Sequence, residues 1–431
     1  MKKRISAVKA ICAVLTTFLS HQASAVATSV DLKDAYRSAL EKTETVPLGQ
    51  TRIQQATERS HQARSRFLPT LSFDANYQAQ ETTVAQSHLR LTTTQSIYNG
   101  GRDSASLRGT KSDEDLQKQN LTVANYALFS DVAREFYAVL SGQTEVENLK
   151  KTIEFAAERV SEINAREKIG RSRNIENLAA QAQLSVIKAQ LLAAEGQLIT
   201  ARDQFTLVTG LPRETELIKT KEIPSPPQKI ETYLLALDKR PDIAMFKAQV
   251  NIAQSKIDSA KAGHLPKVDL LANYYPVKNT IQKGNDWDAG VTMNLLLFQG
   301  GLVSAQVAEA SHKLSENEYL LSQSRRLSEI TIRTSYHNLE SSLNQITALE
   351  SALKSTEQNY REQEKNYRFG QATNLDVIQA LNLFQDTKRS LDRTRYLALS
   401  AAADLKAATA QISLAELPDP TDAKESQKEI K

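Results

Sequence analysis

Cysteine is almost absent from this chain of 431 residues. The single cysteine, Cys12, lies in an apolar run near the N-terminus, so the rest of the chain has no thiol and can form no disulfide. Ile11 stands directly before it, where a lipidation motif has a small residue, and lipid attachment is therefore not expected. The fold has to be held together without covalent cross-links.

Motifs of catalysis and metal binding are absent as well. The sequence contains no G-x-S-x-G, no P-loop and no G-x-G-x-x-G. We therefore expect no catalytic centre, no cofactor and no metal site. Five of the six histidines lie beyond Ala25, none in His-Glu-x-x-His spacing and none with cysteine partners: His61, His88, His264, His312 and His337.

Long hydrophobic runs are also missing. The one apolar run, Ala10 to Leu19, follows a basic segment and precedes Ala23-Ser24-Ala25, which is the order of a secretory leader cleaved after Ala25. The run is much shorter than the ~20 residues that a spanning helix needs. No later stretch reaches that length, so we do not expect helices to hold this protein in a bilayer.

Excess charge disappears once the leader is set aside. The chain has 54 Lys and Arg against 50 Asp and Glu, and the basic residues Lys2, Lys3, Arg4 and Lys9 account for the whole excess. A balanced chain offers no electrostatic surface for nucleic acid. We expect no nucleic-acid partner.

What the chain does have is one strand pattern that occurs twice. Residues 68–77 read LPTLSFDANY and residues 265–274 read LPKVDLLANY, and the matching return arms end in IYNGG and LFQGG. Apolar residues alternate with polar or small ones, through Ala79 in the first forward arm and through Leu297 in the second return arm. This alternation predicts two β-hairpins with one apolar face each. The duplication predicts two similar halves.

Helical patterns surround both hairpins. We expect helices over 32–66 and 233–262 before them, and very long helices after the pairs Gly100-Gly101 and Gly300-Gly301, which we interpret as strand-to-helix corners that need backbone freedom. At ~1.5 Å per residue the first long helix, over 102–168, would span roughly 100 Å. Apolar residues at 3-4 spacing within 184–208 and 339–367 predict coiled-coil seams.

These patterns divide the chain into five expected segments. They are a leader over 1–25, a first repeat over 26–212 with hairpin 67–98 and helical turn 170–174, a linker over 213–239, a second repeat over 240–411 with hairpin 265–298 and helical turn 369–374, and a polar, disordered tail over 412–431.

The predicted fold class is mainly α with a small β part. A four-stranded sheet that is apolar outside and polar inside has unpaired edges, and it cannot close a membrane barrel alone because the smallest barrels have eight strands. Two chains would leave too narrow a lumen, whereas three would give twelve strands and a water-filled one. We therefore expect each chain to contribute four strands to a trimeric transmembrane β-barrel.

The chain resembles the TolC family of outer-membrane channel proteins over nearly its whole length. The resemblance rests on the duplicated order of elements and on LDKRPDIAMFKAQVNIAQSKIDSAKAGHLP before the second hairpin. It also rests on the two turns KIGRSRNIENLAAQAQL and RFGQATNLDVIQALNLF, which align at a spacing of 200 residues. Val46 is a departure, because the family commonly has asparagine there.

The resemblance implies a homotrimer whose strands form a barrel in contact with outer-membrane lipid and whose long helices form a coiled-coil helical barrel across the periplasm. It implies a periplasmic adaptor protein and an inner-membrane pump or ABC transporter as partners. The implied function is a passive exit duct for efflux or type I secretion.

The resemblance also places a periplasmic gate at the two helical turns. Gly170 and Gly370 mark the turns, and Glu176 and Asp376 each follow six residues later. As first-turn acids they are explained by the helix dipole alone. The resemblance instead implies that acids at the position of Asp376 ring a constricted entrance.

Tyr367 matches a family gate residue. We expect its phenol to donate a hydrogen bond to Glu176 across the two turns. An arginine is expected two residues beyond Gly370, but the sequence has Ala372 there. Arg171 or Arg173 could replace it.

Two other functions stay open at this level. A coiled-coil scaffold without transport activity would leave both hairpins unexplained. A stand-alone porin would have no use for helices of roughly 100 Å.

Overall fold

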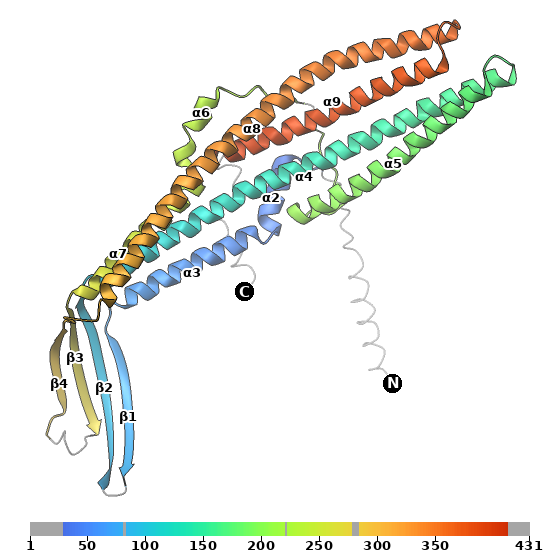
Figure 1. Cartoon of the computed structure of the whole chain (residues 1–431). Coiled ribbons are helices and arrows are strands. Elements are labelled where there is room, and N and C mark those ends of the chain that lie inside the picture. The colour runs from blue at the N-terminus through green and yellow to red at the C-terminus, as the bar shows by residue number, and fades with distance from the viewer. Residues whose placement is uncertain (1–28, 81–82, 220–221, 278–283, 413–431) are drawn as a thin grey trace, which may run out of the picture.

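The computed structural model describes residues 29–412 apart from 81–82, 220–221 and 278–283. Within these residues the chain is elongated, with a small sheet at one end and two long helical hairpins reaching away from it (Figure 1). The expected leader over 1–25, most of the turn after Val277 and the tail after Ile412 lie outside the described residues.

The predicted fold class, mainly helical with a small duplicated β part, is confirmed. The first half comprises α2 (Leu32–Lys42), α3 (Thr45–Ser65), β1 (Thr70–Gln80), β2 (Thr83–Asn99), α4 (Arg102–Lys168) and α5 (Asn174–Thr209). The second half comprises α6 (Ile230–Leu234), the 3-10 helix η1 (Leu237–Lys239), α7 (Pro241–Lys261), the 3-10 helix η2 (Ala262–His264), β3 (Lys267–Val277), β4 (Trp287–Asn294), α8 (Leu302–Arg368) and α9 (Asn374–Ala408).

The four strands form one antiparallel sheet in the order β1-β2-β3-β4, with an apolar outer face. Phe73, Leu91, Tyr274 and Trp287 lie opposite one another in a row across all four strands. Phe73 is 61% and Trp287 68% exposed, although such side chains are normally buried. Among the described residues of one chain, these side chains stay largely uncovered.

The other face of the sheet is polar. Ser72, Thr92, Asn273 and Asp288 form the adjacent row. The Thr92 hydroxyl donates to Asn273 Oδ1 at 2.9 Å, and the Asn273 amide donates to Asp288 at 2.8 Å. Hydrogen bonds therefore continue between side chains from β2 to β4, across the junction of the two hairpins.

The predicted coiled-coil seams are confirmed within each helical hairpin. Leu149 of α4 packs with Ile187 and Ala194 of α5, and Ile346 of α8 packs with Leu391 of α9. Ridges of apolar residues at 3-4 spacing interlock in this way between antiparallel helices. Each hairpin is thus held along its length by an apolar seam. None of the described helices is both long and apolar enough to cross a membrane.

Two helices are shorter than the sequence predicted. The segment 32–66 is interrupted between Lys42 and Thr45, because Pro47 lacks an N–H and its ring collides with the carbonyl four residues earlier. The segment 233–262 is interrupted before Pro241, which occupies the first turn of α7. The residue before a proline is driven into extended backbone, as Arg240 is.

The last strand is also shorter than predicted. We expected alternation through Leu297, but β4 ends at Asn294. The equivalent stretch of β2, beyond Thr94, pairs only with β3, because β1 begins opposite Thr94. Since β4 is the last strand of the sheet, residues 295–299 have no strand beside them in the part of one chain that the structure describes.

A polar clamp holds α7 against the end of α9. The Arg240 guanidinium pairs with the Asp242 carboxylate at 2.8 Å and donates to the carbonyl of Ala408. The Ser328 hydroxyl of α8 also donates to Asp242, at 2.7 Å. Burial alone would raise the pKa of Asp242, but the hydrogen bonds from Arg240 and Ser328 hold this pKa below its usual value.

We predict that Asp242→Asn lowers the free energy of unfolding at neutral pH by about 2 kcal/mol, because it leaves a partly buried guanidinium without its charge partner. A carboxyl whose folded pKa is depressed stabilises the fold above its unfolded pKa of about 4, and this stabilisation is lost as pH falls through the folded value. Denaturant unfolding of the purified protein at several pH values should therefore show wild type and variant converging below pH 4. A constant difference across that range would contradict this account.

Candidate functional site

The candidate site lies at the turns where the two helical hairpins end, far from the sheet (Figure 1). Gly170 and Gly370 have φ values of 73° and 74°, a left-handed conformation that favours glycine. Each turn is closed in the same way, with the N–H of Arg171 bonded to Arg166 O and that of Gln371 to Asn366 O, both at 2.8 Å. The two turns are structural copies.

The acids expected at the entrance each bond within their own turn in the isolated chain. Asp376 forms a capping box with Thr373, accepting from its backbone N–H and its hydroxyl at 2.7 Å each. These two bonds hold the pKa of the exposed Asp376 carboxyl below its usual value. Asp376 is therefore ionised at neutral pH. Glu176 accepts from the Ser172 hydroxyl at 2.8 Å and pairs with Arg173.

Tyr367 is buried between two arginines of the other hairpin. Its side chain is 7% exposed, and the guanidinium carbons of Arg159 and Arg166 lie 4.1 and 4.8 Å from the centre of its ring. Both arginines are on α4, seven residues apart, so they share one helix face. Glu162, between them, pairs with each at 2.8 Å. The charge of the arginines beside the ring is therefore partly balanced.

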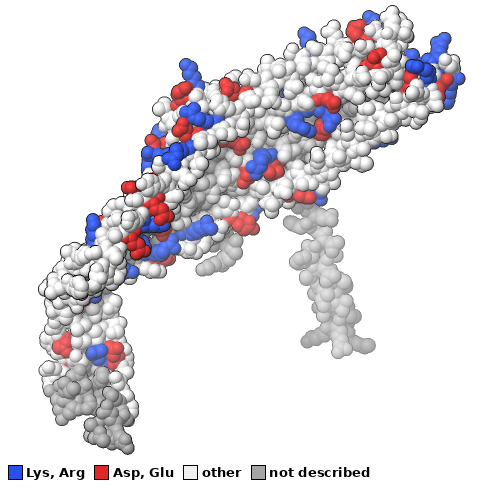
Figure 2. Space-filling model, viewed as in Figure 1, with Lys and Arg blue, Asp and Glu red and all other residues white. Residues whose placement is uncertain are grey.

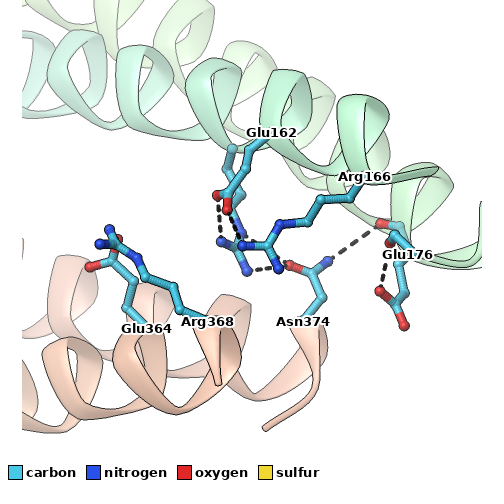
Figure 3. A network of polar contacts seen from close by, with 8 residues as sticks. Glu162, Arg166, Glu176, Glu364, Arg368 and Asn374 are labelled. Carbon is cyan, nitrogen blue, oxygen red and sulfur yellow. Dashed lines mark hydrogen bonds and ion pairs between the residues drawn. The ribbon is translucent and has the colours of Figure 1, made fainter. Parts of the chain in front are cut away.

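Asn374 completes the connection between the hairpins. It is the first residue of α9 and only 1% exposed. Its amide oxygen accepts from Arg159 Nε and Nη2 at 3.2 and 3.1 Å, and its amide nitrogen donates to the backbone oxygen of Glu176 at 3.4 Å. Figure 3 shows Asn374 between Arg166 of α4 and Glu176 at the start of α5. We call Arg159, Glu162, Arg166, Tyr367 and Asn374 the tip cluster.

The structure corrects one expectation about this site. Among the described residues, the Tyr367 hydroxyl makes no hydrogen bond with Glu176, whose carboxylate is occupied by its own turn. Arg173 pairs with Glu176 within that turn, and the tyrosine contacts Arg159 and Arg166. For Arg159 and Arg166, the one usable signal in the sequence is their seven-residue spacing in the long helix. Asn374 could be noticed only as the counterpart of Asn174.

A polar seam continues from the tip cluster toward the middle of the molecule. It joins α4 to α9, whereas the seams inside each hairpin are apolar. The Thr152 hydroxyl donates to Gln385 at 3.1 Å, and the Asn148 amide donates to Asp392 at 2.9 Å. The Arg389 guanidinium donates to Glu145 at 2.7 Å. The two hairpins are thus attached to each other by hydrogen bonds and ion pairs.

The residues at the opposite end have a different role. Gly100, Gly101, Gly300 and Gly301 all have positive φ where a strand passes into a long helix.

Figure 2 shows charged side chains scattered over the helical body and gathered at the tips, while the strands are mostly uncharged on the face in view. Among the described residues, no group of three or more His, Cys, Asp or Glu is placed to hold a metal ion.

Comparisons with known proteins agree with this architecture. The family model for outer membrane efflux proteins matches residues 35–211 and 232–411. Outer membrane protein TolC of Escherichia coli (strain K12) is 24% identical over 291 residues, which cover 60% of this chain and 57% of TolC. Outer membrane efflux protein BepC of Brucella suis biovar 1 (strain 1330) is 24% identical over 233 residues, covering 51% and 49%. The chain spans about half the length of these curated relatives.

Solved structures share the fold at lower identity. The crystal structure of CusC superposes with a TM-score of 0.80 at 15% identity, covering 89% of this chain and 92% of CusC. VceC from Vibrio cholerae superposes with a TM-score of 0.78 at 18% identity, covering 88% and 95%.

We predict that the ring of Tyr367, rather than its hydroxyl, holds the tips together. A cation–π contact of this kind is worth about 1 kcal/mol, so Tyr367→Leu should speed amide hydrogen exchange in residues 369–376 about fivefold, while Tyr367→Phe should leave it unchanged. Tyr319→Leu is the matched control, because Tyr319 is 76% exposed on the same helix. Faster exchange in the Phe variant would show that the hydroxyl matters after all.

Proposed function

The chain belongs to the outer membrane efflux protein family, and from that premise we propose that it forms the passive exit duct of an efflux pump or a type I secretion system. Its location is the outer membrane. The observation that carries the proposal is the sheet, apolar on one face and polar on the other, attached to two helical hairpins with 67-residue long helices. A passive duct needs no catalytic centre, and transport energy would come from a partner.

We propose a homotrimer as the working form. Strand edges have to be paired inside a lipid layer, because no water is there to bond them. The exposed apolar row of Phe73 and Trp287 suits contact with lipid, and the polar row of Asn273 and Asp288 suits a water-filled lumen. Three copies would give twelve strands. A coiled-coil scaffold would give the exposed apolar row no role.

The partners in this proposal are a periplasmic adaptor protein and an inner-membrane pump or ABC transporter. The support is family membership together with the length of α4 and α8, roughly 100 Å at the α-helical rise. Helices of that length, ending in two matched turns, suit a tunnel that reaches from the outer membrane toward machinery on the inner side. The cargo would be selected by that machinery.

The tip cluster is proposed as the closed gate of the duct. Arg159 and Asn374 join the two hairpins of one chain at the tip, while the polar seam joins them further along. Outward movement of α8 and α9 would have to separate Tyr367 from both arginines. Contacts of this size are comparable with the few kcal/mol between the states of many switches.

The division of the chain belongs to the same proposal. Residues 1–25 would be a leader removed after Ala25, and 26–212 and 240–411 would be the two repeats of the duct. Residues 213–239 would form a segment around its middle. Lys219 of this segment pairs with Glu147 of α4 at 2.9 Å, which supports a belt held against the tunnel wall.

The test is conductance of the purified protein in planar bilayers. We predict channels that prefer cations, because three ionised Asp376 carboxylates would share the entrance. Asp376→Asn should reduce the cation preference most clearly at low salt. At 0.1 M salt, exposed charges more than about 10 Å apart are already largely screened. As an internal control, the difference in cation preference between wild type and Asp376→Asn should disappear at high salt. Absence of any conductance from membrane-extracted protein would contradict the proposed function.

A further inference from the structure

The second repeat contains a cavity at the point where α9 ends and α7 begins. Arg240, directly before α7, donates a hydrogen bond to the carbonyl of Ala408, the last residue of α9. The cavity has a volume of about 380 Å³, and residues of α4, α7, α8 and α9 line it. Sites for small molecules typically have volumes of about 300–1,000 Å³, so the cavity is large enough for a small ligand.

The lining of this cavity is partly apolar and carries a net negative charge. Ala127 and the ring of Tyr126 supply apolar surface. The charged side chains of the lining are one guanidinium and two carboxylates, those of Arg240, Asp242 and Asp404. Because Arg240 and Asp242 already pair with each other at 2.8 Å, the one excess negative charge lies on Asp404.

Asp404 forms no ion pair with any of the described residues. Its carboxylate accepts a hydrogen bond from the Ser130 hydroxyl of α4, and Arg134 attracts it from farther away. Arg134 is itself paired with Asp131 at 2.5 Å and with Glu135 at 3.2 Å. Burial raises the pKa of Asp404 above its usual value, because it outweighs the effects of Ser130 and Arg134. A cation that entered the cavity would stabilise the charged form of this carboxyl.

The duplication shows that the fold does not need this carboxylate. The two repeats align here with a shift of 200 residues, because Thr209 and Thr409 are both buried and both donate to the carbonyl four residues earlier. The residue at the place of Asp404 in the first repeat is Gln204, and α5 continues through it to Thr209. The helix therefore forms with an uncharged residue at this position, and the acid of the second repeat is free to serve another purpose.

One wall of the cavity has a strained backbone. Ala410 has a φ of 54° and is the only residue other than glycine with a positive φ in the described part of the chain. Its counterpart Gly210 has a φ of 67°, and a Cβ there would lie 2.8 Å from the Cβ of Lys42. In the second repeat, Ala410 lines the cavity instead. Strain of this kind persists only where the surroundings fix the backbone, so this wall is rigid before any ligand binds.

We propose that this cavity binds a small organic cation, with the positive group at Asp404 and the apolar part against Tyr126 and Ala127. The carboxylate supplies the opposite charge, and the face of a phenol ring attracts cations as well. This inference goes beyond the proposed function, because binding can be measured whether or not the protein conducts.

Two other classes of ligand suit the cavity less well. An anion would be repelled by Asp404, while the guanidinium of Arg240 is already engaged by Asp242 and by the carbonyl of Ala408. A metal ion would find a single free carboxylate, and no group of three or more His, Cys, Asp or Glu is placed to bind one among the residues that the structure describes. An organic cation uses both the charge and the apolar surface.

Isothermal titration calorimetry of the whole protein in a nonionic detergent tests the site, with benzyltrimethylammonium as the probe. Asp404→Asn should weaken binding of the probe about tenfold, because a charged acceptor binds a cation much more strongly than a neutral one. Asp386→Asn is the matched control and should bind like wild type, since Asp386 is 71% exposed on the same helix and does not line the cavity. Benzyl alcohol, a neutral analogue, should show no difference between wild type and Asp404→Asn.

Binding of the probe should also depend on pH, with a sign that the structure determines. The probe keeps its charge at every pH, and it needs Asp404 ionised, so its affinity should decrease as pH falls through the folded pKa that burial raises. Asp404→Asn should remove this dependence. The other titratable groups around the cavity and Asp404 come from two elements and stay in the background of both proteins: Tyr126, Asp131 and Arg134 of α4, and Arg240 and Asp242 at the start of α7.

A second variant tests the cavity while the carboxylate stays in place. Ala127 is exposed and lines the cavity, so Ala127→Phe should fill the space and abolish binding of the probe. Ala157→Phe is its control, because Ala157 is exposed on the same helix away from the cavity. Equal affinities of wild type and Asp404→Asn for the probe would overturn the proposed site. Undiminished binding to Ala127→Phe would overturn it as well.

Discussion

Backbone hydrogen bonding at the sheet edges is the constraint on which the rest of this protein depends. A chain with four strands can pair its inner edges but leaves β1 and β4 open, and an open edge is not tolerated in lipid. The apolar outer row reinforces the constraint, because Phe73 and Trp287 are largely exposed in one chain. In the proposed trimer, closing a ring of copies would solve both problems together. Neither helical hairpin could solve them, since both lie beyond the sheet (Figure 1).

In the helical part, apolar contacts and polar contacts lie in different places. Inside each hairpin, residues such as Leu149 and Leu391 form dry seams that favour one fixed arrangement. Between the hairpins, Asn148 and Asp392 belong to a seam of hydrogen bonds, which water can replace at modest net cost. In the proposed gate, this contrast would let each hairpin stay rigid while the contact between the hairpins opens. The tip cluster is the last part of that contact.

At the tip, aromatic and charged groups act together. Tyr367 is buried although it lies beside an exposed turn, because two guanidinium groups cover its ring. Glu162 balances the charge of both arginines, so neither is left buried without a counter-ion, which would be costly. In the proposed gate, a closed state held this way would resist small fluctuations, and the tip cluster includes no apolar core that would have to separate for the duct to open.

The sequence by itself determined the duplicated hairpins, the long helices and their 3-4 seams, because alternation and heptad spacing are local properties of the chain. It also marked the turns through Gly170 and Gly370. Only the tertiary structure decided that Tyr367 contacts Arg159 and Arg166 rather than Glu176, since these partners lie some two hundred residues away. The breaks before α3 and α7 were not predicted from periodicity, because in each segment a single proline interrupts a long helical pattern. The end of β4 at Asn294 depended on a neighbouring strand, and no periodicity within a strand can report whether one is there.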